Sequence, residues 1–304
     1  MSVFSKNSVV NARQFMRRKL YFLWIVIAFF SESVIYGQDF HLQTYTRENG
    51  IPSELVKSVA VDSIGFLWLG TDNGLYRYNG KQFIDYSHLI SSAYVKSLLC
   101  DSRGNLYFTT DMSFGRINYT LVDVSVQTIA KGAVKRSDGM LWYPKQLYVD
   151  GNGNIWFSDN TSLYRYKNNQ LNHYFMGAHN MADSFSRSFS FFEDDNGNLG
   201  MVSHAGNFYR YNPAIDIIEP LTNPLMFENV SSILSIGSNR LLIGFNEQFG
   251  EIILNSQGHI SKYNPISYGV DASSFIQKSE NSWYVGSWSK GLWELKSTPA
   301  NRYE

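Results

Sequence analysis

One segment of the chain recurs, and this recurrence restricts the fold more than any other feature of the sequence. The first copy runs from Glu48 to Tyr86 and holds four short apolar runs, separated by the turn sequences DSIG, DNG and NG. Short alternating runs bounded by such turns predict a four-stranded antiparallel meander. A lone meander cannot bury both of its faces, so this segment must pack against neighbours of its own kind.

Five further copies follow, and they align on the residue in the middle of the second strand. The aligned residues are Trp68, Tyr107, Trp156, Gly200, Leu242 and Tyr284. Their spacing of about 40–50 residues is typical of propeller blades with four strands each. The third strand recurs as GLYRY, SLYRY, NFYRY and GLWEL. The sequence therefore predicts an all-β propeller of six four-stranded blades, with an incomplete seven-bladed ring as the alternative.

The predicted propeller occupies residues 38–304, after a leader at residues 1–37. Its repeats lie at about 48–86, 91–129, 144–175, 186–219, 229–262 and 268–298. Trp68 and Trp156 share one repeat position, and a large aromatic residue there is expected to pack between adjacent blades.

The first 37 residues have the order of a secretory signal. A basic region ends at Lys19, the apolar run Leu20 to Phe30 follows, and Ser31 to Gly37 is short and polar. Because the apolar run is shorter than the ~20 residues that span a bilayer, we expect cleavage after Gly37, with Ser33 as the alternative site. This predicts a periplasmic or secreted protein. Anchoring by an uncleaved leader is the alternative, and the leader is then the contact with the membrane.

The last repeat has no evident fourth strand after Leu292 to Lys296. Phe40 to Thr46 alternates like a strand and precedes the first repeat. Because an open blade edge favours aggregation, we expect Phe40 to Thr46 to pair antiparallel with Leu292 to Lys296 and close the ring.

Composition and motifs argue against several classes of function. Lys plus Arg and Asp plus Glu both number 26, which gives no electrostatic reason to expect nucleic acid. The single Cys100 and six scattered histidines offer no metal-site spacing. The segment from Asp150 begins like a calcium loop, but Ile155 and Thr161 stand where that loop needs Gly and Glu, so a plain turn is predicted. We find no catalytic motif, and predict no enzyme, no cofactor and no metal.

One repeat position suggests a ligand-binding face. The residue four positions after each aligned residue begins the turn between the second and third strands. These residues are Asp72, Asp111, Asn160, His204, Asn246 and Trp288. Turns of this kind share one face of a propeller, where polar groups and one aromatic ring suit a polar ligand or the face of a sugar. The alternative is that Asp and Asn are simply favoured at the start of turns.

The first copy resembles the repeat of the two-component regulator propeller family. The matching residues are Gly50, Pro52, Asp62, Gly65, Trp68, Gly70, Thr71, Gly74 and Leu75, with Ile51 and Asn79 as departures. The resemblance implies the periplasmic sensor part of hybrid two-component systems of Bacteroidetes, many of which respond to polysaccharide breakdown products. The sequence contains six repeats and no kinase or output region, so the resemblance concerns the sensor part. A truncated gene, a fragment and a stand-alone propeller stay open.

These observations predict an extracytoplasmic sensor module for a glycan-derived or other polar ligand. A homodimer and a partner signalling protein are further candidate partners. One alternative is a secreted polysaccharide lyase or glycosidase, which needs two carboxyl groups, or a His, Tyr and Arg set, at the central channel. Asp72 and Asp111 are its candidate carboxylates. The other alternative is a structural propeller that binds a protein.

Overall fold

The computed structural model describes residues 44–51, 53, 55–132, 140–177, 189–221, 225–298 and 303. The propeller begins a compact unit at Tyr45. Its described residues form β-strands and two short 3-10 turns, η1 (Arg47–Asn49) and η2 (Ser87–Leu89). The predicted leader lies outside the described residues.

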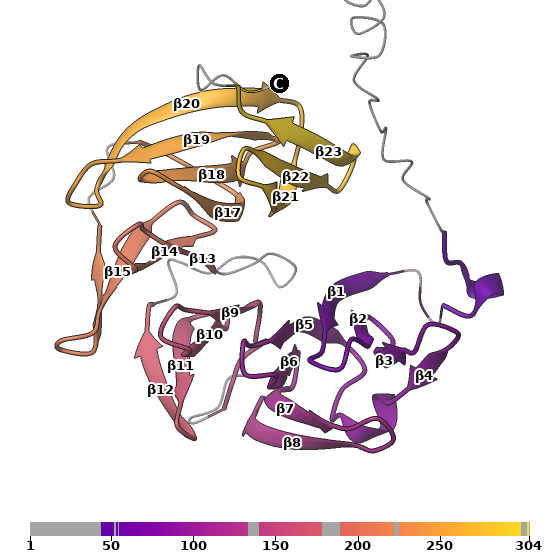
Figure 1. The fold of residues 1–304 in the computed structure, drawn as a ribbon. Coiled ribbons are helices and arrows are strands. Elements are labelled where there is room, and N and C mark those ends of the chain that lie inside the picture. The colour runs from indigo at the N-terminus through magenta and orange to yellow at the C-terminus, as the bar shows by residue number, and fades with distance from the viewer. Residues whose placement is uncertain are drawn as a thin grey trace, which may run out of the picture. The chain divides into compact units, whose positions relative to one another are not determined.

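Six antiparallel sheets follow one another along the chain and form the six blades of a β-propeller (Figure 1). The strands are β1(Val56–Val61), β2(Leu67–Thr71), β3(Gly74–Tyr78) and β4(Phe83–Asp85) in the first blade; β5(Val95–Cys100), β6(Leu106–Thr110), β7(Ser113–Tyr119) and β8(Val124–Lys131) in the second; β9(Leu147–Val149), β10(Ile155–Ser158), β11(Ser162–Lys167) and β12(Gln170–Phe175) in the third; β13(Phe189–Glu193), β14(Leu199–Ser203), β15(Phe208–Asn212) and β16(Ile217–Pro220) in the fourth; β17(Val230–Gly237), β18(Arg240–Phe245), β19(Gln248–Leu254) and β20(Ile260–Tyr268) in the fifth; and β21(Ala272–Ser279), β22(Ser282–Ser287) and β23(Gly291–Lys296) in the sixth. The prediction of an all-β propeller with six blades is confirmed.

An aspartate builds the turn between the first and second strands of several blades. In the first blade, Asp62 Oδ1 accepts hydrogen bonds from the backbone amides of Ile64, Gly65 and Phe66 at 2.9–3.0 Å. Gly65 has a φ of 103°, a region where side chains are strained. The second carboxylate oxygen accepts from the Trp68 indole at 2.7 Å. One aspartate therefore fixes both the turn and the tryptophan that packs beyond it.

The third blade repeats this arrangement and settles the reading of its Asp150 segment. Asp150 Oδ1 accepts from the amides of Asn152 and Asn154, and Oδ2 accepts from the Trp156 indole at 2.8 Å. Both oxygens are thus used by protein donors, as the predicted turn requires.

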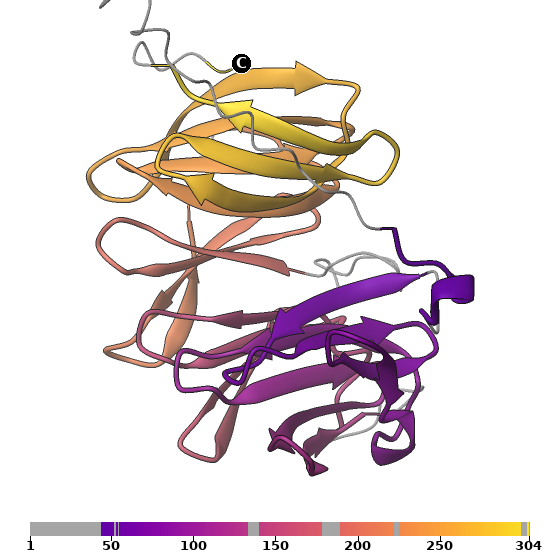
Figure 2. The same cartoon turned by 45° about the vertical axis from the view of Figure 1, so that its right-hand side comes forward.

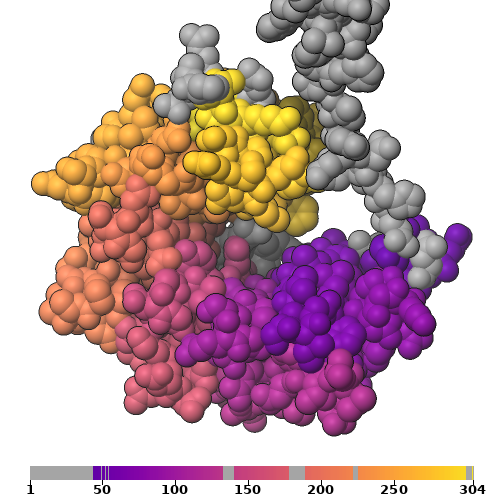
Figure 3. All heavy atoms as spheres, viewed as in Figure 1, coloured from indigo at the N-terminus to yellow at the C-terminus, as the bar shows by residue number. Residues whose placement is uncertain are grey.

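The core lies between the blades. Five clusters of buried side chains each join two successive blades, so the sheets pack face to face. Figure 2 shows the successive sheets as ribbons, and Figure 3 shows the blades as spheres in chain order from indigo to yellow. Trp68 joins the first blade to the second, and Trp156 joins the third to the fourth. Both side chains are 0% exposed, which confirms that they pack between blades.

The last blade departs from the prediction, because its described sheet has three strands. Of the segment expected to close it, residues 40–43 lie outside the described residues, and Tyr45 and Thr46 are not in a strand. Tyr45 instead packs on the first blade, with its ring 5.4 Å from that of Tyr78 and 5.7 Å from that of Phe83. Its hydroxyl also lies 2.9 Å from the Tyr78 hydroxyl. The aromatic contacts of Tyr45 therefore favour the first blade over the last.

The C-terminal end of the chain contacts the edge of the last blade. Tyr303 forms an antiparallel bridge with Ser297, just beyond β23, and its hydroxyl donates to Glu251 Oε1 at 2.5 Å. This contact ties the end of the sixth blade to the fifth.

Candidate functional site

The turns between second and third strands and the segments that lead into the first strands belong to one face of a propeller, called the turn face below. Two predicted site residues brace their own blades on this face. Ser53 Oγ donates to Asp72 Oδ1 at 2.5 Å, and the Ser92 hydroxyl donates to Asp111 Oδ1. These carboxylates have the structural role of turn residues, whether or not they also meet a ligand.

Two more predicted residues are also hydrogen-bonded within the turn face. His204 Nδ1 donates to the Val230 carbonyl oxygen at 3.0 Å, which ties the fourth blade to the fifth. Asn246 Oδ1 accepts from Asn229 Nδ2 at 2.7 Å.

Asn160 and Trp288 have more capacity for a ligand than the other predicted residues. Asn160 is 4% exposed, and its Oδ1 has no hydrogen-bond partner among the described residues. A buried acceptor of this kind costs about 1–3 kcal/mol unless something donates to it. Trp288 is 74% exposed, so its ring is free to stack on a sugar.

Lysines that the sequence analysis did not single out gather on the turn face of the first three blades. We call Lys57, Lys96 and Lys145 the lysine cluster. Lys57 and Lys96 are the extra residues of β-bulges in β1 and β5, between Val56 and Ser58 and between Val95 and Ser97. Lys145 lies two residues before β9, and its amide donates to the Ser158 carbonyl oxygen at 2.7 Å. The repeated tripeptide Val-Lys-Ser was the signal in the sequence.

Two tyrosine rings pack against the amino groups of this cluster. Lys96 Nζ lies 4.9 Å from the centre of the Tyr143 ring and 6.0 Å from that of Tyr94. Lys57 Nζ lies 5.2 Å from the Tyr94 ring centre, so Tyr94 contacts two of the lysines. Tyr143 has a φ of 58°, a strained value for a residue with a side chain. Strained residues of this kind concentrate at functional sites.

Charge and burial make Lys96 unusual. Burial, the largest cause, and the like charges of Lys145 and Lys57 together lower the pKa of Lys96 to about 8, against the opposing charge of Asp111. Part of the Lys96 population is therefore neutral near neutral pH, although the ordinary lysine is fully charged there.

A second region of the turn face lies between the fifth and sixth blades and has the opposite character. A pocket of about 360 Å³ is lined by Asn229, Ser231, Asn246, Glu247 and Asp271. Burial raises the pKa of Asp271, but hydrogen bonds from Ser287 and Ser289 outweigh it and leave that pKa below its usual value. This pocket therefore presents carboxylates and amides, whereas the lysine cluster presents ammonium groups.

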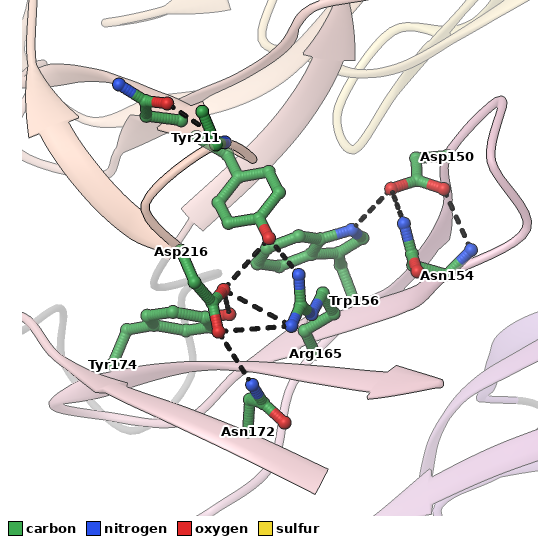
Figure 4. Close-up of polar contacts among 10 residues, drawn as sticks. Asp150, Asn154, Trp156, Arg165, Asn172, Tyr174, Tyr211 and Asp216 are labelled. Carbon is green, nitrogen blue, oxygen red and sulfur yellow. Dashed lines mark hydrogen bonds and ion pairs between the residues drawn. The ribbon is translucent and has the colours of Figure 1, made fainter. Parts of the chain in front are cut away.

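A polar network joins the third and fourth blades (Figure 4). We call it the latch, and its members are Arg165, Asn172, Tyr174, Tyr211 and Asp216. Tyr174 and Tyr211 donate to Asp216 Oδ1 at 2.6 and 2.9 Å, and Asn172 donates to Oδ2 at 2.9 Å. Arg165 adds an ion pair with Asp216 at 3.2 Å.

The latch contains the tyrosines, arginine and carboxylate that a lyase could use, yet its position argues against that role. Its residues come from third and fourth strands and the loop between them, away from the first strands at the centre. Its carboxylate already accepts from four side chains. The latch is best understood as a structural contact between blades.

Two further properties of the described residues concern metal binding and membrane spanning. No three His, Cys, Asp or Glu side chains in the described part of the chain come together as metal ligands. No described helix is long and apolar enough to cross a membrane.

Comparisons with known proteins find similar folds but do not identify a family. No family model and no curated protein matches this chain. Many solved structures are similar, including these three. Virginiamycin B lyase from Staphylococcus aureus is 16% identical, with 86% of each chain covered and a TM-score of 0.62. A protein from Lactobacillus plantarum is 12% identical, with 82% of this chain and 83% of that one covered and a TM-score of 0.62.

The third similar structure is the extracellular domain of a putative hybrid two-component system from B. thetaiotaomicron. It is 17% identical, with a TM-score of 0.59, and the match covers 80% of this chain and 33% of that one. This chain therefore spans about a third of the length of that domain. The propeller is similar both to an extracellular domain of a putative hybrid two-component system and to a lyase, and at these identities the similarity shows the fold.

Proposed function

We propose that this protein is an extracytoplasmic ligand-sensing propeller that binds a glycan-derived or other polar ligand on its turn face. The observation that carries the proposal is Asn160, a buried residue of that face whose Oδ1 has no hydrogen-bond partner among the described residues. A ligand hydroxyl that donates to it removes this energetic cost. The exposed ring of Trp288 supplies a surface for stacking.

Further support comes from the sequence and from one comparison. The predicted signal would place the propeller in the periplasm or outside the cell. The first repeat resembles that of the two-component regulator propellers, and the extracellular domain of a putative hybrid two-component system shares the fold. In this proposal the propeller detects the ligand, and a homodimer or a partner signalling protein transmits the event.

A binding screen tests the proposal. The chain from Gln38 onward is applied to a panel of neutral and charged oligosaccharides, and hits are measured by calorimetry. We expect saturable binding that weakens about tenfold in Asn160→Ala, because the lost hydrogen bond is worth roughly 1–2 kcal/mol. Lys262→Ala, an exposed change on the outer strand β20, is the matched control and should bind normally. Binding that is insensitive to Asn160 and Trp288 would contradict the proposed face.

A polysaccharide lyase is the second candidate, because Lys96 has the properties of a general base. A lysine whose pKa lies near 8 can accept a proton at neutral pH, which an ordinary lysine does poorly. Mass spectrometry of the same oligosaccharides after incubation distinguishes the two candidates. Shortened, unsaturated products that disappear in Lys96→Gln would favour the lyase, and intact ligands would favour the sensor.

A further inference from the structure

The lysine cluster is built from equivalent positions of neighbouring blades. β1 and β5 pair with their second strands through the same interruption, and in each the extra residue is a lysine between Val and Ser. A β-bulge turns the extra side chain away from the regular pleat. The corresponding bulges of β17 and β21 carry Ser231 and Ser273 instead. The positive charge is thus a property of the first three blades, and not of the repeat in general.

More like charge than opposite charge acts on Lys96. Asp111 is the carboxylate whose charge acts most on Lys96, and it also accepts a hydrogen bond from Ser92. Lys145 is 5% exposed and acts on Lys96 with a like charge, as does Lys57. Like charges held in a partly buried place repel one another more strongly than in water. A bound anion would reverse this repulsion into attraction.

Uncharged groups beside the cluster suit the rest of a sugar. Asn160 donates its backbone amide to the Trp142 carbonyl oxygen at 3.1 Å, so its orphaned Oδ1 belongs to the segment that carries Tyr143. Gln146, next to Lys145, has a buried Oε1 that also has no partner within the described ranges. Two tyrosine rings therefore adjoin amino groups of the lysine cluster, and the segment around Tyr143 also holds two acceptors without a partner among the described residues.

We infer that the lysine cluster, with Tyr94, Tyr143 and Asn160, binds the anionic group of an acidic sugar, a carboxylate or a sulfate. This inference rests on the proposed function and specifies the ligand class of the same face. Lysine recognises an anion as a point charge, so carboxylate and sulfate share the site chemistry. The pocket between the fifth and sixth blades, with Glu247 and Asp271, would repel such a group and accept neutral hydroxyls. The ligand is thereby oriented with its acid toward the first three blades.

Calorimetry with three related probes tests the inference. The probes are a trigalacturonate, a sulfated chondroitin disaccharide and neutral maltotriose, each titrated into the chain from Gln38 onward. We expect at least one acidic probe to bind and to lose about tenfold or more in affinity in Lys96→Gln, as expected for one charge-assisted hydrogen bond. Lys96→Arg should retain binding because it keeps the charge. Lys81→Ala, an exposed lysine in the turn between β3 and β4, is the matched control.

Salt and pH supply a second readout. Affinity should fall with added salt, and it should fall as pH rises above about 8, because Lys96 then loses its proton and its charge. Equal affinity for the carboxylate probe and the sulfate probe would identify a general anion site. A preference for one probe would identify the anionic group that the site recognises. Binding of an acidic probe that is unchanged in Lys96→Gln, or absence of acidic binding, overturns the inference. Lys96-independent binding of maltotriose in that case leaves the proposed polar-ligand sensor standing.

Discussion

The latch and the lysine cluster use charged side chains in opposite ways. In the latch, the carboxylate of Asp216 accepts from two tyrosines, an asparagine and an arginine, so every charge has an opposite or polar partner. In the lysine cluster, burial and then the like charges of Lys145 and Lys57 lower the pKa of Lys96, and Asp111 is the opposing charge. The first arrangement joins two blades. The second holds like charges close together, and a bound anion would reduce the repulsion between them.

This difference indicates that the outer strands and the turn face of the propeller have different roles. Outer strands carry contacts that hold blades together. The turn face carries hydrogen-bonded turn residues, and beside them the strained Tyr143, the like charges around Lys96 and the acceptor of Asn160 that has no partner among the described residues. A change in the first region should therefore lower stability, whereas a change in the second should lower binding and can raise stability.

The largest effect is expected from Trp156→Ala. The indole is fully buried, lies 4.8 Å from the Tyr211 ring centre, and donates to Asp150. Its removal leaves a large cavity and removes one hydrogen bond to Asp150 Oδ2, so the free energy of unfolding should fall by about 3–5 kcal/mol. Urea denaturation followed by fluorescence measures it. Trp288→Ala, on the turn face, should change stability by less than about 0.5 kcal/mol. Equal effects of the two changes would remove the distinction between the regions.

Asp216→Ala should have the next largest effect. It leaves Arg165, whose side chain is 18% exposed, without its carboxylate, and it removes acceptors from Tyr174 and Tyr211. Because Asp216 is itself 44% exposed, water moderates the loss, and we expect about 1–3 kcal/mol. Asp216→Asn keeps one carbonyl oxygen and should recover part of this stability. An unchanged unfolding midpoint in Asp216→Ala would show that the latch does not stabilise the fold.

Lys96→Met should act in the opposite direction. Removing a partly buried charge that two other lysines repel is expected to raise the free energy of unfolding by about 1 kcal/mol. Lys262→Met removes an exposed charge and serves as the control. Thermal unfolding of both variants at neutral pH measures the difference. Destabilisation by Lys96→Met would mean that the cluster is a structural element like the latch.

The smallest effect concerns the alkaline range. Burial, followed by the hydrogen bond to Asp216, raises the pKa of Tyr174. A raised pKa means that the folded protein retains the proton more strongly than the unfolded chain. The associated stability is therefore present below the ordinary tyrosine value of about 10, and is lost as pH rises from there through the raised value. Tyr174→Phe should show a shallower loss of stability above about pH 10. A curve parallel to that of the wild type would contradict this.

The sequence by itself determined the repeat and everything that depends on local chemistry. Asp62 and Gly65 specify a turn wherever they occur in this pattern. A four-stranded meander cannot cover the tryptophan six residues after Asp62 by itself, so a neighbouring blade must bury it. Six copies of the strand-and-turn pattern predicted the six blades, and the shared repeat position of Trp68 and Trp156 predicted their packing. The six predicted site positions, the first Asp72 and the last Trp288, followed from the same register. The structure places them on the turn face. Some of them are hydrogen-bonded to other residues of that face and some are not, and the register cannot distinguish the two groups.

Only the tertiary structure decided which distant residues meet. The partners of Arg165 lie on another blade, about 50 residues along the chain, and no local pattern specifies them. The lysine cluster depends on bulges that redirect Lys57 and Lys96, and on the contact between first strands of successive blades. Tyr45 contacts the aromatic side chains of Tyr78 and Phe83 on the first blade, a contact that its alternating sequence did not indicate. Strand and turn preferences depend on short segments of sequence, whereas side-chain contacts between blades depend on how whole sheets pack.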